Sequence, residues 1–367
     1  MDKVRFSVVG CGNIGARHVH FLTKLPEAEV VSVCDVKEDR AQAGAGAAGA
    51  KAVTDIREVL RDPGVDVVDI CTPSGLHASM SVSAMKAGKH ALSEKPMALN
   101  LRDADRIIKA QESTGMMYFL VKQNRYNPPI AALKRALESG ALGRVLMISS
   151  NVFWNRRRGY YEEEAWRGTL ALDGGALYTQ SSHFVDLLLW FADRPTAVEA
   201  HMMNLDHRYT ETEDTGTMRI EFESGAVAVM NYTTATYESN LEGSITVLGT
   251  KGSVKVGGKY LNELVEWKVE GMDRPELPPS SPPNLYKGGY QGSMSNHDKV
   301  LQNVIDVLKK GDRAAVSNLE GRSTVEVMQA AHISALKGRK VLLPLKGRNA
   351  SFDIGKAPPF PERRASQ

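Results

Sequence analysis

The sequence predicts an α/β protein in two parts: an N-terminal doubly wound parallel sheet, and a C-terminal α+β domain with a large, mostly antiparallel open sheet. Three observations carry this prediction. Short apolar runs alternate with longer helical stretches up to residue 122, strand-like runs follow one another after Gly143, and a glycine-rich turn directly follows the first apolar run. Alternating strands and helices are typical of βαβ units, whereas consecutive strands are typical of an antiparallel sheet.

The N-terminal part, residues 1–122, is expected to bury its strands beneath helices on both faces. Its apolar runs are short and almost unbroken, as parallel strands covered on both faces are. The predicted strands are Val4–Val9, Val30–Cys34, Val65–Ile70, His90–Ser93 and Met117–Val121, and the predicted helices are Arg17–Lys24, Lys37–Ala48, Ser79–Ala87 and Leu101–Gly115.

The C-terminal part, residues 123–348, has a strand-rich pattern with hairpin-like turns. The predicted strands are Arg144–Trp154, Ala197–Met203, Thr217–Phe222, Ala226–Thr233, Ser244–Leu248 and Ser253–Val256, and the predicted helices are Thr179–Phe191, His297–Lys310 and Asn318–Leu336. The segment 275–292, rich in Pro, Gly and Ser, is expected to be a surface loop. Residues 349–367 carry three prolines and no apolar periodicity, which predicts a flexible tail.

The composition is that of an ordinary soluble globular protein, with 42% hydrophobic and 24% charged residues. The net charge of +3 is too balanced for a nucleic-acid surface, although a local basic patch for an anionic small molecule fits it. Three cysteines without CxxC spacing predict no disulfide framework and no metal site, and they favour the cytoplasm. We find no signal-peptide pattern and no run of about 18 apolar residues, so no membrane span is expected.

The turn after the first predicted strand has the pattern G-x-G-x-x-G, from Gly10 to Gly15. In this context glycines permit a tight turn and let backbone N–H groups approach a pyrophosphate at a helix N-terminus. Asp35 ends the next strand, 20 residues after Gly15, where an acid accepts hydrogen bonds from the adenosine ribose and disfavours a 2′-phosphate. The pair predicts NAD, although Lys37 and Arg40 nearby leave NADP open. For Asp35 alone, a helix N-cap is the other interpretation.

Two further turns follow predicted strands, at the edge where a doubly wound sheet places its ligands. One is Cys71-Thr72-Pro73-Ser74 and the other is Ser93-Glu94-Lys95-Pro96. A lysine in such a crevice could polarise a carbonyl or hydroxyl group, and desolvation would lower its pKa. A surface lysine before a proline turn is the alternative.

The segment Asp173-Gly174-Gly175 leads into the predicted helix Thr179–Phe191. Thr179 and His183 are four residues apart, so one helix would present both on the same face. His183 could then act as a general base near neutral pH, although a lone helical histidine is more often structural. Just before this helix, arginines alternate with aromatic residues, which is typical of either a solvated loop or an anion site. These residues are Trp154, Arg156, Arg157, Arg158, Tyr160, Tyr161, Trp166 and Arg167.

Together these motifs resemble the Gfo/Idh/MocA oxidoreductases over roughly residues 4 to 345. The most specific motif is Glu94-Lys95-Pro96, and Ala87-Gly88-Lys89-His90 and Lys251-Gly252-Ser253 fit as well. The resemblance implies an NAD-binding Rossmann domain in which Lys95 and His183 lie beside the nicotinamide and the reacting carbon. It implies a cofactor site formed by Gly10, Gly12, Asn13, Ile14, Asp35, Thr72, Pro73, Ser74, His77, Glu94, Lys95 and Gln123.

A narrower resemblance is to the WlbA-type enzymes, which oxidise the 3-hydroxyl of UDP-N-acetylglucosaminuronic acid for bacterial surface polysaccharide. The matching segments include Val121-Lys122-Gln123-Asn124-Arg125, Asn151-Val152-Phe153-Trp154 and Asn240-Leu241-Glu242-Gly243. Thr179 stands where many relatives carry aspartate; in the WlbA type this position is typically asparagine. The resemblance implies a UDP-sugar substrate bound by Lys95, Asn124, Arg125, Arg156, Tyr161, Arg167, Thr179, Gln180 and His183.

Two other functions stay open from the sequence. One is a different sugar or inositol dehydrogenase of the same fold, or a glycosidase that uses bound NAD transiently. The other is a non-catalytic nucleotide-binding sensor. Apolar alternation in the strand around residues 226–232 suits pairing between subunits, and the resemblance implies a homo-oligomer, with a tetramer favoured over a dimer.

Overall fold

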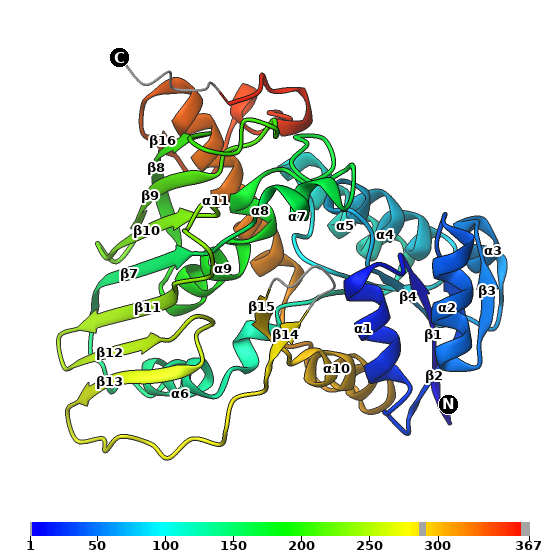
Figure 1. The fold of residues 1–367 in the computed structure, drawn as a ribbon. Helices are drawn as coiled ribbons and strands as arrows, with labels where there is room; N and C mark the ends of the chain where they lie inside the picture. The colour runs from blue at the N-terminus through cyan, green and yellow to red at the C-terminus, as the bar shows by residue number, and fades with distance from the viewer. Residues whose placement is uncertain (1, 286–290, 361–367) are drawn as a thin grey trace. The chain divides into compact units, whose positions relative to one another are not determined.

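The computed structural model describes residues 2–285 and 291–360, and its ribbon separates into two compact units (Figure 1). Unit 1 comprises Met1–Ala98, Arg102–Gln123 and Asn296–Arg322. Unit 2 comprises Leu99–Leu101, Asn124–Ser295 and Ser323–Gln367. The chain therefore passes from the first unit to the second and returns to the first near residue 296.

Unit 1 is built on a parallel sheet of six strands in the order β3-β2-β1-β4-β5-β6, which confirms the predicted doubly wound fold. β1 and β4 lie at its centre and are almost wholly buried, because helices cover both faces. The strands are β1 Val4–Val9, β2 Ala28–Cys34, β3 Lys51–Val53, β4 Val67–Ile70, β5 His90–Ser93 and β6 Tyr118–Leu120. The helices are α1 Asn13–Leu22, α2 Glu38–Ala48, α3 Ile56–Arg61, α4 His77–Lys86 and α5 Leu101–Thr114, with 3-10 turns at Ser74–Leu76 and Gln123–Tyr126.

Helix α10, His297–Lys310, completes unit 1 although it follows most of unit 2 in the sequence. It packs against α1 and β1, and Lys309 Nζ forms an ion pair with Glu27 Oε1 at 2.6 Å. Its apolar face, which includes Leu301 and Ile305, is buried. The two units therefore do not follow the linear division into residues 1–122 and 123–348 that the pattern along the chain predicts.

Unit 2 is built on an eight-stranded sheet in the order β13-β12-β11-β7-β10-β9-β8-β16. Its strand pairs are antiparallel except for β7 and β10, so the predicted mostly antiparallel sheet is confirmed. The strands are β7 Val145–Phe153, β8 Pro195–Met203, β9 Thr215–Phe222, β10 Val227–Thr233, β11 Glu242–Gly249, β12 Gly252–Gly257, β13 Glu263–Val269 and β16 Val341–Leu342. A separate ribbon pairs β14 Pro283–Leu285 with β15 Gln291–Met294, inside the segment expected to be a loop.

Helices cover one face of this sheet. The side chains of β7 and β10 alternate, with Ile148, Val152, Ala228 and Met230 fully buried and their neighbours partly exposed. α9 contacts β7, α6 contacts β12, and Ser334 of α11 accepts a hydrogen bond from a backbone N–H of β8. The helices are α6 Pro128–Glu138, α7 Arg158–Glu162, α8 Ala176–Thr179, α9 Ser182–Phe191 and α11 Asn318–Lys337.

The segment after residue 348 is not the free tail that its prolines predict. It forms 3-10 turns at Gly347–Asn349 and Ile354–Lys356. Ile354 is 1% exposed, and the ring of Phe360 packs edge-on against His332. The apolar side chains therefore anchor the segment as far as Phe360, and residues 361–367 lie outside the described part of the chain.

No helix within the described residues is long and apolar enough to cross a lipid bilayer.

Candidate active site

The glycine-rich turn in unit 1 has the tight geometry that a pyrophosphate site needs. Gly10 has a φ of 92°, and a Cβ there would lie 2.7 Å from the carbonyl oxygen of Cys71. A Cβ on Gly15 would lie 1.8 Å from the carbonyl oxygen of Gly10. A Cβ on Gly12, in contrast, would have only Arg40 Nη1 near it, at 4.0 Å. The turn therefore has no room for a side chain at Gly10 or Gly15 but has open space at Gly12, where α1 begins. This arrangement fits a bound diphosphate.

Asp35 lies at the end of β2 and ties this turn to the next element. Its Oδ2 accepts a hydrogen bond from the backbone N–H of Cys11 at 2.7 Å, and its Oδ1 accepts one from Lys37 at 2.8 Å. Each carboxylate oxygen can accept a second hydrogen bond, so the group retains capacity for ribose hydroxyls. The sequence spacing between the turn and Asp35 thus corresponds to a direct contact.

His77 bridges the other two turns of unit 1. Its Nδ1 lies 2.7 Å from the carbonyl oxygen of Pro96, and its Nε2 lies 2.9 Å from that of Thr72. Burial lowers the pKa of His77, so the neutral ring donates to one of the two carbonyls. The side chain predicted to contact the cofactor therefore holds the Thr72-Pro73-Ser74 turn against the Glu94-Lys95-Pro96 turn.

Glu94, at the end of β5, turns its carboxylate into unit 1. Oε1 lies 3.2 Å from His18 Nε2 and 3.3 Å from His297 Nε2, and Oε2 accepts the backbone N–H of Lys95 at 3.1 Å. The two imidazoles hold the pKa of Glu94 well below its usual range, against the opposing effect of burial. Sequence reasoning assigned no role to His18 or His297, because neither has informative spacing to Glu94.

In unit 2 the predicted helix Thr179–Phe191 is two helices, so the expectation of a shared helical face for Thr179 and His183 is wrong. α8 ends at Thr179 and α9 begins at Ser182. Thr179 Oγ1 bonds back to the carbonyl of Gly175 at 3.0 Å, and the N–H of Ser181 reaches the carbonyl of Ala176 five residues back. These local bonds interrupt the regular helical hydrogen bonds, so Thr179 and His183 belong to different helices.

Asp173, directly before α8, is a buried carboxyl group. Burial raises its pKa to about 7, and the nearby Glu213 adds to that rise. The backbone N–H of Gly168 donates to its Oδ2 at 2.5 Å, which opposes the shift. This group titrates near neutral pH within the segment that carries Thr179, and the sequence pattern gave no signal of it.

The guanidinium of Arg156 joins several residues that the sequence predicts for substrate binding. Arg156 is 2% exposed and donates from Nε to Gln180 Oε1 at 2.9 Å. Its Nη1 donates to Asn240 Oδ1 at 3.2 Å, and Gln180 Nε2 donates to the hydroxyl of Tyr160 at 3.1 Å. The guanidinium of Arg167 lies 4.1 Å from the ring centroid of Tyr160. Arg156, Gln180 and Arg167 therefore form one cation–aromatic cluster in unit 2, which also includes Asn240 and Tyr160.

Arg125 lies in an ion pair instead of an open position. Its guanidinium donates twice to the carboxylate of Asp186 on α9, at 2.8 Å each, and lies 4.7 Å from the ring centroid of Trp190. Gln123 and Asn124 beside it are buried, at 3% and 2% exposure. A fork-shaped pair of this kind fixes the connection after β6 to helix α9. A substrate role for Asn124 and Arg125 stays a prediction.

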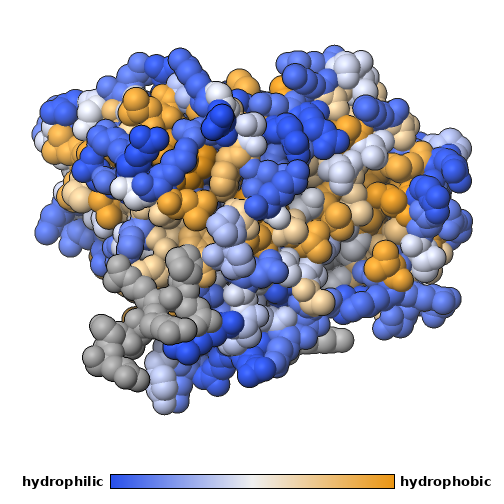
Figure 2. Space-filling view, turned by 90° about the horizontal axis from the view of Figure 1, so that it is seen from above, coloured by the Kyte–Doolittle hydropathy of each residue, from blue (hydrophilic) through white to orange (hydrophobic). Residues whose placement is uncertain are grey.

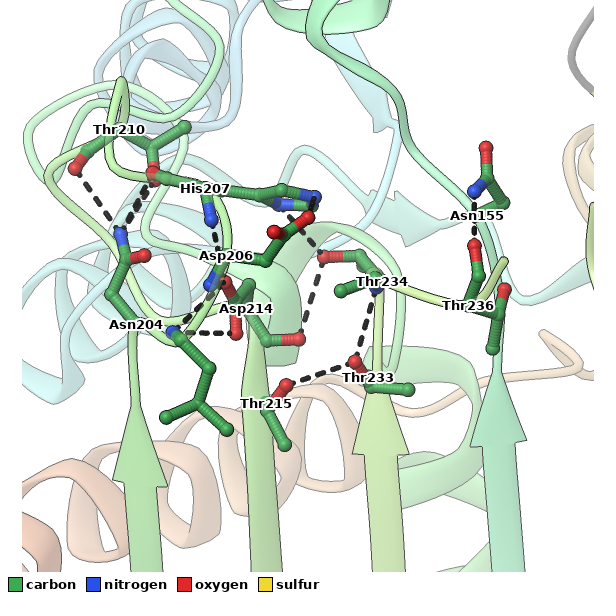
Figure 3. Close-up of polar contacts among 12 residues, drawn as sticks. Asn155, Asn204, Asp206, His207, Thr210, Asp214, Thr215, Thr233, Thr234 and Thr236 are labelled. Carbon is green, nitrogen blue, oxygen red and sulfur yellow. Dashed lines mark hydrogen bonds and ion pairs between the residues drawn. The ribbon is translucent and has the colours of Figure 1, made fainter. Parts of the chain in front are cut away.

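Tyr161 packs against His207, which belongs to a loop between β8 and β9 that hydrogen bonds hold together. Figure 3 shows these hydrogen bonds around Asn204 and Asp214. In that loop Asp214 Oδ2 accepts the backbone N–H groups of Leu205, Asp206 and His207 at 3.0, 2.7 and 2.8 Å. The ring of His207 lies 5.1 Å from that of Tyr161. The loop thus places the rings of His207 and Tyr209 against Tyr161 at the edge of the sheet where β7, β8 and β10 end.

Comparison with known families matches both parts of the chain. Residues 4–122 match the oxidoreductase family with an NAD-binding Rossmann fold, and residues 130–255 match the GFO/IDH/MocA C-terminal domain. The chain belongs to the Gfo/Idh/MocA oxidoreductase family. It is an NAD-dependent dehydrogenase, which agrees with the open cradle at Gly12 and the acid at Asp35.

Among solved structures, the WlbA dehydrogenase from Chromobacterium violaceum, in complex with NADH and UDP-GlcNAcA, is 37% identical with a TM-score of 0.85. The alignment covers 95% of this chain and 98% of that one. The WlbA dehydrogenase from Bordetella pertussis, with the same ligands, is 36% identical with a TM-score of 0.84, over 94% and 100% of the two chains. The myo-inositol 2-dehydrogenase from Thermotoga maritima is 27% identical over 93% of this chain and 98% of its own length.

Proposed function

We propose that this Gfo/Idh/MocA dehydrogenase oxidises the 3-hydroxyl of a UDP-sugar, UDP-N-acetylglucosaminuronic acid, with NAD. The observation that carries the proposal is the similarity to two WlbA dehydrogenases, which extends over nearly the whole chain and includes complexes with UDP-GlcNAcA. The cation–aromatic cluster of Arg156, Arg167 and Tyr160 supports it, because a uronate and a diphosphate are both anionic.

Oxidation of a secondary alcohol to a ketone removes the proton of the hydroxyl group and a hydride from the carbon that carries this hydroxyl. NAD supplies the acceptor for the hydride when it is bound. We assign Lys95 and His183 to the proton, with His183 as general base and Lys95 as the hydrogen-bond donor to the developing alkoxide. The reverse assignment of the two roles is chemically equivalent in its products.

The UDP group would contribute binding energy away from the reacting carbon. Such a handle orients the sugar ring, so its loss lowers the rate of the chemical step as well as the affinity. Arg156 and Arg167 are the arginines that we assign to this anionic handle. A protein of net charge +3 can hold a ligand with two negative charges on its diphosphate and one on its uronate in this way, because only the local field at the cluster must be positive.

A second candidate is oxidation of an inositol or another free sugar. It is favoured by the 27% identity to the inositol dehydrogenase from Thermotoga maritima. Thr179 argues against it, since many sugar and inositol dehydrogenases that this chain resembles carry aspartate at that position.

The test is to follow the absorbance of reduced nicotinamide after mixing the protein with NAD and UDP-N-acetylglucosaminuronic acid. A single-turnover trace at high enzyme concentration guards against an unfavourable equilibrium toward the 3-keto product. We expect reduction in the wild-type protein and a loss of at least about 100-fold in Lys95→Ala and in His183→Ala. His201→Ala, at an exposed position on β8, is the matched histidine control and should retain the wild-type rate.

Reduction of NAD by myo-inositol but not by the UDP-sugar would replace the proposal with the second candidate. NAD binding without hydride transfer from either substrate class would favour a nucleotide-binding sensor.

A further inference from the structure

Unit 1 contains a buried chain of four polar side chains that the proposed chemistry does not use directly. They come from four separate elements: His18 from α1, Asp69 from β4, Glu94 from the end of β5 and His297 from α10. His18 Nδ1 lies 2.8 Å from Asp69 Oδ2, and its Nε2 lies 3.2 Å from Glu94 Oε1. His297 Nε2 lies 3.3 Å from the same Glu94 oxygen. None of the four side chains is more than 6% exposed.

The geometry fixes where the protons are. An ionised carboxylate only accepts hydrogen bonds, and each ring nitrogen of His18 faces a carboxylate. Two acceptors need two donors, so His18 is an imidazolium between two anions. His297 donates its Nε2 proton to Glu94, and its Nδ1 has no hydrogen-bond partner among the described residues. His297 is therefore neutral.

The electrostatics agree with this assignment. The charge of Asp69 raises the pKa of His18 well above its usual value and outweighs the opposing effect of burial. Burial lowers the pKa of His297. Among the described residues, the other titratable or charged groups that interact with these side chains are Cys71 and Cys11 near Asp69, His77 near Glu94, and Arg17, which acts on His297. Burial raises the pKa of the Cys71 thiol, so it adds no charge at neutral pH.

Glu94 connects these four side chains to the backbone of the proposed catalytic lysine, Lys95. Glu94 Oε1 receives His18 and His297, while Oε2 receives the backbone N–H of Lys95 at 3.1 Å. If Oε1 lost its donors, a carboxylate with one hydrogen bond inside an apolar interior would be costly and would rotate toward water. The backbone of Lys95 would then lose its acceptor.

We infer that His18, as a buried imidazolium, is a positioning residue that works with His297 to hold Glu94 in the orientation that fixes the Glu94-Lys95 turn. The inference rests on the proposed function only for the role of Lys95 itself. His18 does not touch the reacting atoms; it acts through Glu94. Helix α10, which belongs to unit 1, supplies His297 to this set of side chains as its first residue.

The same atoms could in principle bind a metal ion, because those of His18, Glu94 and His297 lie within 4.8 Å of one another. A metal would take the place of the protons between the rings and the carboxylate. The two interpretations differ in what they predict for the ring nitrogens, so a direct measurement separates them.

The first experiment is a solid-state 15N spectrum of protein labelled at histidine, recorded at pH 8 with and without His18→Gln to assign the signal. We expect both nitrogens of His18 to be protonated, whereas a histidine with an ordinary pKa of about 6.5 would be neutral at that pH. A neutral His18 ring would overturn the inference. So would a stoichiometric metal found by mass spectrometry in the wild-type protein and lost from the variant.

The second experiment compares two partial mimics of histidine. His18→Gln keeps a donor near the Nε2 position and so keeps the bond to Glu94, whereas His18→Asn keeps a donor near Nδ1 and serves only Asp69. We expect the asparagine variant to lose about 100-fold in kcat with little change in the KM for the sugar, and the glutamine variant to stay within about threefold of wild type. His20→Gln, on the exposed side of the same helix, is the matched control.

Equal losses in the two His18 variants, or no loss in either, would overturn the role through Glu94. Melting curves show whether the asparagine variant folds, and if it does not, the 15N spectrum of the wild-type protein still decides. Absence of sugar oxidation in the wild-type protein would instead count against the proposed function. The 15N signature and the affinity for NADH, measured by fluorescence, would then test the network alone.

Discussion

Buried ionisable side chains in this protein differ in how their charge is compensated. Glu94 has two imidazoles against one oxygen, and its pKa falls. Asp173 is equally enclosed, but its hydrogen-bond donors are backbone N–H groups and the Thr179 hydroxyl, which carry no charge, and Glu213 lies nearby; burial raises its pKa to about 7. The contrast shows that burial alone does not decide the protonation state; the hydrogen-bond partners of the carboxylate do.

The raised pKa of Asp173 has a consequence for stability. Because the folded state binds this proton more tightly than the unfolded state, where the value is 3.8, stability falls as pH rises from about 4 to about 7. Asp173→Asn should remove that penalty and stabilise the protein at pH 8 by up to roughly 4 kcal/mol, with little difference below pH 4. Chemical denaturation at several pH values measures this. Destabilisation at pH 8 would show instead that the ionised carboxylate is the preferred form.

His18 and Glu94 give the opposite dependence at the two ends of the pH range. The pKa of Glu94 is depressed, so its contribution to stability is present above its unfolded value of 4.5 and is lost as pH falls through the folded pKa. The pKa of His18 is raised, so its contribution is complete below 6.5 and is lost as pH rises through the folded pKa. In His18→Gln the alkaline loss should be absent from the melting temperature, and it should persist in His20→Gln.

Arg156 offers a test of the cation–aromatic cluster. Its planar guanidinium donates to both Gln180 and Asn240, which a lysine ammonium cannot do in the same geometry. Arg156→Lys should raise the KM for the UDP-sugar about 10- to 100-fold and change the affinity for NADH little. Arg157→Lys, next to it but exposed, is the matched control in steady-state kinetics. Equal effects of the two substitutions would remove Arg156 from the substrate site.

Site residues that belong to a sequence motif were predicted from the sequence, whereas residues that only folding brings together were not. The cradle glycines and Asp35 are recognisable because their spacing reflects one βαβ unit, and the structure places them in direct contact. His297 lies more than 200 residues from Glu94 along the chain, and only folding brings the two together. Arg125 has the side chain of an anion binder, but its partner, Asp186, is part of the fold.

At the scale of elements, the glycine-rich turn can be tested one position at a time. Gly10→Ala should prevent normal folding of the turn, since the Cβ would lie 2.7 Å from a backbone carbonyl at a positive φ. Gly12→Ala has open space and should keep the melting temperature, but it should weaken NAD binding because the Cβ points where the backbone must approach the diphosphate. Calorimetric titration with NAD and thermal melting separate the two effects.

Gly46→Ala is the control for these substitutions. It lies within α2 with no atom within 4 Å of the added Cβ, and it should stabilise the helix by about 0.5–1 kcal/mol without altering NAD affinity. Equal NAD affinity in Gly12→Ala and Gly46→Ala would contradict the assigned role of the turn.

Elements with an unbroken apolar run or a strongly amphipathic face were predicted well, whereas elements without such a pattern were missed. Val4–Val9 and His297–Lys310 have the predicted bounds, because an apolar run defines the first and an amphipathic face defines the second. β3 has three residues and only one is buried, so its sequence has no detectable strand pattern. The break between α8 and α9 arises from local hydrogen bonds at Thr179 and Ser181, which hydrophobic periodicity does not register.

At the scale of the whole molecule, hydrophobic residues reach the surface in several places (Figure 2). One set is aligned by the register of the sheet in unit 2: Met147 of β7 lies opposite Val227 of β10 and Leu248 of β11. Met147 is 39% exposed and Leu248 is 38% exposed. An exposed row of this kind on an uncovered sheet face suits pairing between subunits.

Met147→Lys should therefore lower the oligomeric state, which light scattering after size-exclusion chromatography would measure. We expect a tetramer, or a dimer, for the wild-type protein and a smaller species for the variant. Lys109→Ala, at an exposed position on helix α5 of unit 1, is the control and should leave the mass unchanged. A wild-type protein that elutes as a monomer would remove the prediction.

The return of α10 to unit 1 affects the order in which the protein can be completed during synthesis. The first 123 residues leave the ribosome with the six strands of the parallel sheet but without His297, so Glu94 must wait for its second histidine donor, which is encoded beyond most of unit 2. Domains that fold as contiguous segments can mature one after another as they emerge. Here the cofactor unit becomes complete only after residue 322 has been made, so in a nascent chain or a truncated fragment His18 would be the one histidine left to compensate the Glu94 carboxylate beside Lys95.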